Sequence, residues 1–155
     1  MLIRAATPHD AEAVGWIVAE AYAPYIPRIG REPAPMAADH RALIAATGRV
    51  WVADEASGTP VGVPVIVVGT DHVLVKNVAV ARSAQGRGLG RLLLEHAEQQ
   101  ARQLGLREVR LYTNAAITEN LAMYPHLGYV EVNRRTEDGF DRVYFRKNLL
   151  TDRSS

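Results

Sequence analysis

Apolar residues cluster in four segments of the first 80 residues, in the pattern expected of β-strands. The segments are Leu2–Ala6, Val50–Asp54, Val61–Val68 and Val73–Val80, and the last three are rich in valine. β-Branched side chains are stiff and pack well on a pleated surface, which favours strands. Short turn sequences at residues 57–60 and 69–71 separate the last three segments. These short connections predict that the three strands are antiparallel neighbours.

Helical spacing appears after the first of these strands, at Val14, Ile17, Val18 and Ala21. Because Thr7 can act as an N-cap, a helix is predicted over residues 8–23. Four prolines between positions 24 and 35 then exclude regular structure, and residues 24–31 are predicted to form a long ordered loop or a broken helix. A second helix is predicted over residues 36–47, ending at Gly48.

The second half of the chain alternates between the two patterns. A helix is predicted over Leu89–Leu104 and is closed by Gly105, and a shorter one over Thr118–Leu127. Strands are predicted over residues 109–113, 129–134 and 142–147, the last two joined by a turn at residues 137–139, with a disordered tail from residue 151. The order of elements predicts an α/β fold with one mixed sheet, in a single domain over residues 1–150.

Composition and charge exclude several classes of protein. The 155 residues carry a formal net charge of +1, which argues against a broad nucleic-acid surface, and no cysteine is present for disulfides or thiol chemistry. The five histidines and the carboxylates show no clustered ligand spacing, so no metal is expected. The longest apolar stretch, Val61–Val68, is too short to span a bilayer, and the N-terminus lacks the pattern of a secretion signal. A cytoplasmic protein without a membrane partner is therefore predicted.

A glycine-rich loop lies between the fourth predicted strand and the helix that follows it. Its sequence from Ser83 to Arg91 is Ser-Ala-Gln-Gly-Arg-Gly-Leu-Gly-Arg. Alternate glycines let a ligand approach the backbone, and a helix N-terminus presents free N–H groups and a positive dipole end. Arg87 and Arg91 add positive charge. The loop therefore predicts a site for a phosphate or pyrophosphate.

Three other interpretations of this loop fit the sequence less well. A tight turn that binds nothing would not need three glycines. A dinucleotide fingerprint would need a third glycine where Arg91 stands, and a nucleoside-triphosphate loop would need a Gly-Lys-Ser/Thr ending that is missing here.

Two motifs resemble the GNAT family of CoA-dependent N-acetyltransferases. The family's pyrophosphate loop reads Arg/Gln-x-x-Gly-x-Gly/Ala, and Gln85, Gly88 and Gly90 stand at its places. The later stretch Asn120–Tyr129 resembles the family's Asn…Ala…Tyr-x-x-x-Gly-Phe/Tyr segment, although Asn120 lies four residues before Tyr124 where many members have seven. The resemblance implies a mostly antiparallel sheet that is splayed between its fourth and fifth strands and flanked by helices.

The resemblance also implies how acetyl-CoA is held. The loop backbone would bind the pyrophosphate, and pantetheine would pair with the fourth strand as an added strand. The residues implied in cofactor binding are Val78, Val80, Gln85, Gly86, Arg87, Gly88, Leu89, Gly90, Arg91, Asn120 and Tyr124.

The implied reaction is direct transfer of the acetyl group to a primary amine of a small molecule or peptide. The Val78 N–H would act as oxyanion donor, and Tyr124 would protonate the departing thiolate as general acid. Asn114 is an alternative to Asn120, with a capping role equally open. Many members carry a glutamate base on the fourth strand, but Lys76 and Asn77 occupy that region here. His72 and Asp71 remain candidates for a base acting through water, and the general base stays open.

The acceptor is expected to contact the connection between the first two helices. In the resembling fold this connection covers the acceptor side, and here it contains Tyr22, Tyr25, Arg28 and Arg31. Aromatic rings supply contact area and arginines grip anions, so an acceptor with both an amine and an anionic group is predicted. The alternative is that these arginines pair with surface carboxylates such as Glu32 or Asp39.

Two other functions stay open. The lack of the family's glutamate fits a non-catalytic acyl-CoA-binding or sensing module, and the glycine loop alone would fit a regulator that binds another phosphate ligand. The sequence also leaves open the identity of the acceptor, the use of longer acyl groups, and whether the chain acts alone or as a homodimer.

Overall fold

The computed structural model describes residues 2–46 and 49–149. In this part of the chain, one sheet of seven strands has the order β1-β2-β3-β4-β5-β7-β6. The strands are β1 (Leu2–Ala5), β2 (Trp51–Asp54), β3 (Pro60–Val68), β4 (Val73–Val80), β5 (Glu108–Asn114), β6 (Val130–Glu137) and β7 (Phe140–Asn148). The predicted tail from residue 151 lies outside the described residues.

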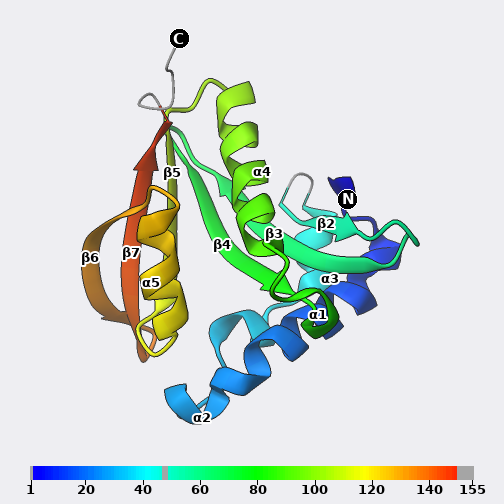
Figure 1. The fold of residues 1–155 in the computed structure, drawn as a ribbon, viewed down its shortest axis with the longest axis horizontal. Coiled ribbons are helices and arrows are strands. Elements are labelled where there is room, and N and C mark those ends of the chain that lie inside the picture. The colour runs from blue at the N-terminus through cyan, green and yellow to red at the C-terminus, as the bar shows by residue number, and fades with distance from the viewer. Residues whose placement is uncertain (1, 47–48, 150–155) are drawn as a thin grey trace.

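The sheet is mostly antiparallel and opens between β4 and β5. The pairs β1–β2, β2–β3, β3–β4, β5–β7 and β6–β7 are antiparallel, whereas β4 and β5 are parallel. The parallel pairing joins only Val73–Val75 to Val109–Leu111, while both strands continue well beyond it. Figure 1 shows β4 and β5 side by side near the C-terminal end and diverging toward α2. The predicted fold class, including the splay between the fourth and fifth strands, is confirmed.

Helices cover the sheet on both sides. They are α1 (Ala11–Tyr22), α2 (Ile26–Ile29), α3 (His40–Ala45), α4 (Leu89–Gln103) and α5 (Thr118–His126), with 3-10 turns at Pro8–Asp10, Ala23–Tyr25, Ala34–Ala37 and Arg82–Ala84. In Figure 1, α4 lies in front of β3 and β4, and α5 lies in front of β5 and β7. The described residues include no helix with the length and apolar character needed to cross a membrane.

Burial on both faces explains the valine-rich run in β3. A side chain at Gly62 would meet Leu89 and Leu93 of α4. Because successive residues point to opposite faces, the neighbouring Val61 and Val63 face the side of α1, where they join the core with Val14. A strand with both faces covered is apolar along its length instead of alternating.

The sequence predicted either a long ordered loop or a broken helix after α1, and the structure has the broken helix. Its 3-10 turn and α2 end at Gly30, which has φ +87°. The next helix was predicted to begin at Met36, and this was wrong. Only a 3-10 turn covers Met36, and α3 begins at His40 because the Asp39 side chain accepts a hydrogen bond from Ala42 N at 3.0 Å. The predicted end of that helix, at residues 47–48, lies outside the described residues.

The final hairpin is longer than predicted. β6 continues to Glu137 and β7 begins at Phe140, so only Asp138 and Gly139 form the turn. Both have positive φ, at 53° and 80°, which is the geometry of a tight two-residue turn. The charged sequence of β6 hid its length, because an exposed edge strand has no apolar face to reveal it.

Candidate active site

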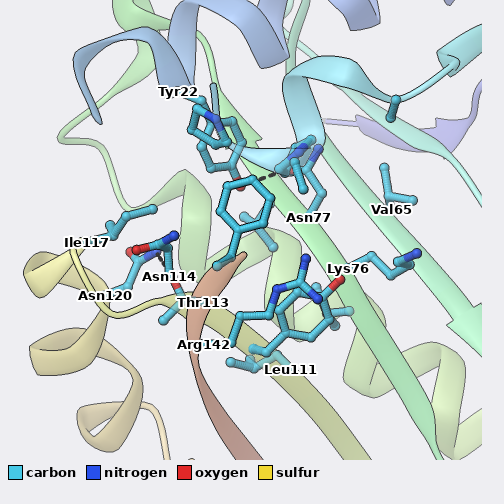
Figure 2. Close-up of a pocket in the computed structure, with 18 of the residues that line it drawn as sticks. Tyr22, Val65, Lys76, Asn77, Leu111, Thr113, Asn114, Ile117, Asn120 and Arg142 are labelled. Carbon is cyan, nitrogen blue, oxygen red and sulfur yellow. Dashed lines mark hydrogen bonds between the residues drawn. The ribbon is translucent and has the colours of Figure 1, made fainter. Parts of the chain in front are cut away.

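A cavity of about 350 Å³ lies where β4 and β5 diverge. Figure 2 shows strand and helix side chains from both sides of the splay around it, with Tyr22 and Asn77 from one side and Thr113, Asn120 and Arg142 from the other. The cavity therefore exists because of the splay, since the two strands would otherwise close on one another.

One backbone N–H of β4 is directed toward this cavity instead of toward β3. Ile66 N in β3 bonds to Arg49 O, on the far side of β3 from β4. By alternation Val65 and Val63 face β4, where they pair with Asn77 and Ala79. The intervening Val78 therefore directs its backbone N–H toward β5, which has already separated from β4 at that level.

A β-bulge sets this alternation. Val65 pairs with Asn77 and Ile66 with Val75, so Lys76 is the extra residue in β4. A bulge bends its strand and redirects the groups that follow it. It lies at the point where pairing with β5 ends, so it helps to open the sheet.

Tyr22 at the end of α1 reaches this strand. Its hydroxyl donates to Asn77 Oδ1 at 2.7 Å, as Figure 2 shows. Burial raises the pKa of the Tyr22 phenol, the nearby Tyr124 phenol raises it further, and a hydrogen bond from the Val78 backbone acts in the opposite direction. The Tyr22 hydroxyl thus lies between the Asn77 side chain and the Val78 amide.

Tyr124 in α5 lines the same cavity and is 6% exposed. Its ring meets Phe145 edge-on, with the ring centroids 5.5 Å apart. Burial raises the pKa of its hydroxyl, so the phenol is protonated throughout the neutral range. A protonated, buried hydroxyl of this kind can donate a proton to a group in the cavity.

The glycine loop leaves open space at the start of α4. Gly88 is the N-cap of α4 with φ +76°, and Gly86 has φ +82°. Apart from the adjacent residues and the backbone of the same helix, no atom of the described structure lies within 4 Å of the place where a Cβ at Gly86, Gly88 or Gly90 would be. The helix N-terminus is therefore open to a ligand, and only glycine takes the two positive φ values without strain.

The loop's polar side chains have partners within the protein. The Gln85 side chain donates to Val80 O at 3.1 Å, so this carbonyl is held by the loop that follows it. Arg87 contacts Glu55 at 3.2 Å and donates to Ser83 O, and Arg91 pairs with Glu95 at 3.3 Å. The loop is thus held in shape by its own side chains, while its backbone stays open.

The two asparagine candidates differ in their surroundings. Asn120 lines the cavity and donates to Thr113 Oγ1 at 3.0 Å. Asn114 also lines it, but its Oδ1 accepts from Ala116 N at 2.9 Å, which is the turn role that the sequence left open.

The residues predicted for the acceptor are only partly brought together. Tyr22 lines the cavity, whereas Tyr25, Arg28 and Arg31 do not. Arg28 forms a two-point pair with Glu119, at 2.6 and 3.0 Å, and its guanidinium lies 5.0 Å from the Tyr25 ring.

Arg31 lies over the Phe140 ring at 4.0 Å and donates to Asp138 O. Within the described part of the chain, the hydrogen-bond partners of both arginines are therefore distant in sequence, and neither Glu32 nor Asp39 is among them. Any contact of Arg28 or Arg31 with an acceptor stays a prediction.

The candidate bases lie apart from the cavity. His72 pairs with Asp71 at 2.7 Å before the start of β4, which is the end opposite the splay. Among the described residues that line the cavity, Asp138 has the one carboxylate and His40 the one imidazole. Burial lowers the pKa of His40, and its Nε2 has no hydrogen-bond partner in the described structure.

Sequence reasoning missed several lining residues. Tyr112, Phe140, Asp138, Arg142 and His40 were not proposed as site residues. Tyr112 is on β5, and Arg142 on β7 stacks on its ring at 4.7 Å. Finding them needs the spatial arrangement of β4, β5, β7 and α3, which no local pattern gives.

Comparison with known proteins gives the family. Residues 46–131, which are 86 of the 155 residues, match the family described as "Acetyltransferase (GNAT) domain". The chain belongs to the GNAT acetyltransferase family. The match includes β4, the glycine loop, α4 and Tyr124, so the GNAT motifs include residues that build the cavity.

A segment of the chain is also similar to a curated protein. It is 46% identical over 57 residues to N-alpha-acetyltransferase 80 of Mus musculus. The segment is 37% of this chain and 17% of the mouse protein, so this GNAT chain matches about a sixth of that relative's length.

Solved structures share the fold over nearly the whole chain. The ribosomal-protein-S18-alanine N-acetyltransferase from Escherichia coli has a TM-score of 0.75 at 22% identity, over 96% of this chain and 93% of that chain. The PaiA N-acetyltransferase from Thermoplasma acidophilum, in complex with coenzyme A, has a TM-score of 0.76 at 18% identity, over 95% and 98%. A GNAT acetyltransferase from Elizabethkingia anophelis with acetyl-CoA bound matches over 68% and 78%, with a TM-score of 0.61 at 21% identity. At these identities the likeness shows the fold.

Proposed function

We propose that this GNAT protein transfers the acetyl group of acetyl-CoA directly to a primary amine of a small molecule or peptide. The observation that carries the proposal is the Val78 backbone N–H, which faces a cavity between two separated strands and lies on the strand that leads into an open glycine loop. Two solved relatives, one with coenzyme A and one with acetyl-CoA bound, support the choice of co-substrate.

The residues present fit acetyl-CoA. The space at Gly86, Gly88 and Gly90 would be narrowed by any Cβ, and it adjoins the N-terminus of α4, where backbone N–H groups favour a pyrophosphate. Val78 and Val80 would pair with the pantetheine arm, with the Val80 carbonyl already shared with Gln85. When bound, acetyl-CoA supplies an activated acetyl thioester.

The protein's own groups have defined tasks in this proposal. The Val78 N–H stabilises the charge that develops on the thioester oxygen, and the Tyr124 phenol keeps a proton available for the sulfur. The described cavity walls hold a neutral amine beside the thioester, which removes much of the entropic cost of the reaction.

The names of relatives bear on the acceptor. The E. coli and mouse proteins are named as acetyltransferases of a ribosomal-protein alanine and of an N-alpha position, which supports a peptide α-amine. A further solved relative, with a TM-score of 0.60 at 23% identity over 65% of each chain, is named nourseothricin acetyltransferase, which supports a small molecule. We further propose that the protein acts in the cytoplasm, without nucleic-acid or membrane partners, alone or as a homodimer.

A non-catalytic acyl-CoA-binding module is the second candidate. The observation that favours it is the position of Asp138, the one carboxylate among the described lining residues, which lies at the tip of the β6–β7 turn instead of on β4. A module of this kind would bind acetyl-CoA and release no CoA in the presence of amines.

Calorimetry and thiol release separate the two candidates. Acetyl-CoA is titrated into the purified protein without added metal, and CoA release is then followed with a panel of small amines and short peptides. Binding with amine-dependent release is the expected result. Binding without release from any amine would favour the module, and no binding at physiological acetyl-CoA concentrations would overturn both.

A further inference from the structure

The Tyr22 hydroxyl lies beside the Val78 backbone amide, which the proposed reaction uses as its oxyanion donor. It donates to Asn77 Oδ1 at 2.7 Å, and it accepts a hydrogen bond from the backbone N–H of Val78 on the same strand. Tyr22, Asn77, Val78 and Tyr124 all line the one cavity. A phenol from α1 therefore lies beside the amide that faces the open side of β4.

The hydroxyl group has the chemistry of a donor at this site. Burial raises the pKa of the Tyr22 phenol, so the phenol keeps its proton at neutral pH. The hydroxyl now donates its hydrogen bond to Asn77 Oδ1, the neutral amide oxygen of a residue that is 7% exposed. The Val78 N–H now donates to the Tyr22 hydroxyl oxygen. A thioester oxygen that replaces the Tyr22 oxygen as the acceptor of the Val78 N–H could also accept from the Tyr22 O–H, after a small rotation of that hydroxyl.

We propose that the Tyr22 O–H and the Val78 N–H together form a two-donor site for the carbonyl oxygen of the acetyl thioester. The inference rests on the proposed function and adds a residue from a different element to its site. One donor is a side chain of α1 and the other is the backbone of β4, so they approach the carbonyl oxygen from different directions. Together they would fix both the position and the orientation of the carbonyl group.

The step balances without another reactant. A nitrogen–carbon bond forms between the neutral amine and the carbonyl carbon, and the carbonyl electron pair moves onto the oxygen held by Tyr22 and Val78. The oxygen electron pair then re-forms the carbonyl, and the carbon–sulfur bond breaks with its electron pair going to sulfur. The sulfur takes a proton from Tyr124, and the amine nitrogen loses a proton that restores the Tyr124 phenol directly or through water. Asn77 Oδ1, released by Tyr22, can accept a hydrogen bond from the amine N–H.

The test measures binding of ligands that differ in the carbonyl oxygen. Acetyl-CoA, S-ethyl-CoA, whose thioether lacks that oxygen, and free CoA are titrated into the wild type, Tyr22→Phe and Tyr144→Phe. Tyr144 on β7 lies outside the cavity lining and serves as the matched control. In the wild type, acetyl-CoA is expected to bind about two- to tenfold more tightly than S-ethyl-CoA.

Tyr22→Phe is expected to lose most of this preference while its affinity for free CoA stays unchanged. Its kcat should fall on the order of a hundredfold, and Tyr144→Phe should match the wild type. A preference for acetyl-CoA that survives in a folded Tyr22→Phe protein would overturn the two-donor site while leaving the proposed function intact. Failure of the wild type to bind acetyl-CoA would instead overturn the proposed function.

Asn77→Val provides a second variant in case Tyr22→Phe does not fold. It removes the competing acceptor, so the Tyr22 proton remains available for the carbonyl oxygen. The preference for acetyl-CoA over S-ethyl-CoA should be kept or increased. A preference lost in Asn77→Val would show that Asn77, and not Tyr22, recognises the acetyl group.

Discussion

Two backbone angles at the start of α4 matter at the scale of single residues. Gly86 and Gly88 both have positive φ, and neither has a described neighbour where a side chain would go. The same combination occurs at Gly105 after α4, with φ +73° and open space. Gly105 therefore offers a control with the same conformational strain but no role in the proposed cradle.

Gly88→Asp should weaken acetyl-CoA binding by roughly tenfold or more, because it places bulk and negative charge where the pyrophosphate would lie. Gly105→Asp carries a similar strain and should leave the Kd unchanged. Calorimetry on both variants decides, and equal affinities would show that the loop does not hold the cofactor.

Tyr124→Phe should lower kcat about ten- to a hundredfold with little change in the Kd for acetyl-CoA, since the phenol proton matters mainly in the transition state. The raised pKa of the Tyr124 phenol means that the phenol stays protonated well above neutral pH. Removing the hydroxyl should therefore lower kcat at every pH of the assay. Steady-state kinetics from about pH 6 to 9, a range well below the raised pKa, test this. Unchanged turnover at every pH would reject Tyr124 as the acid.

At the scale of elements, the connection between α1 and α3 is fastened to the far half of the molecule. Arg28 of α2 pairs with Glu119 of α5, and Arg31 stacks on Phe140 of β7. These contacts join the two sides of the splay at the end where Figure 1 shows it widest. The arginines thus position the wall that was predicted to meet the acceptor.

Arg28→Ala should raise the KM for the acceptor several-fold and leave the Kd for acetyl-CoA unchanged, because it frees α2 from α5 without touching the glycine loop. Arg134→Ala removes a comparable exposed arginine, paired with Glu131 on β6, and should change neither quantity. A panel of amines with and without an anionic group also tests whether Arg28 recognises charge. An unchanged acceptor KM would separate this contact from the acceptor site.

Most elements could be predicted from local patterns, and the exceptions have identifiable causes. The valine-rich strands and the helix after the glycine loop were predicted within a residue or two, because burial imposes a clear period. The start of α3 and the length of β6 were not predicted correctly. A capping side chain at Asp39 decided the first, and an exposed edge strand without apolar alternation concealed the second.

At the scale of the whole molecule, the buried residues form two core clusters. One gathers residues of α1, α3, β2 and β3 with the start of α4, and the other gathers residues of β5, β7 and α5 with the rest of α4, the end of β3 and the start of β4. Val78 packs against both. At the outer edge of the first cluster, Arg4 on β1 bonds both to Asp10, at 2.9 Å, and to Asp54, at 2.7 Å.

Asp10→Asn should lower the free energy of unfolding by about 2 kcal/mol at neutral pH. The hydrogen bond from Arg4 lowers the pKa of Asp10 from 3.8 to about 2. A lowered folded-state pKa means that the contribution is present above the unfolded value of 3.8 and is lost as the pH falls through about 2.

Urea unfolding of the wild type and Asp10→Asn at about pH 7 and about pH 2.5 measures this. The difference between them should shrink strongly at the lower pH, and Glu12→Gln on the exposed side of α1 should show no comparable effect. A difference that is the same at both pH values would mean that Asp10 stabilises the fold without its charge.

The sequence by itself determined the type of most elements and the GNAT motifs, and it predicted a phosphate site at the glycine loop. These features depend on residues close together in the chain, where periodicity, glycine geometry and helix termini act locally. Only the tertiary structure decided where β4 and β5 part, which backbone N–H faces the gap, and that Tyr22 and Asn77 meet there. Those outcomes depend on strand order, on a one-residue bulge at Lys76 and on the packing of α1 against β4, which brings together residues 55 positions apart along the chain.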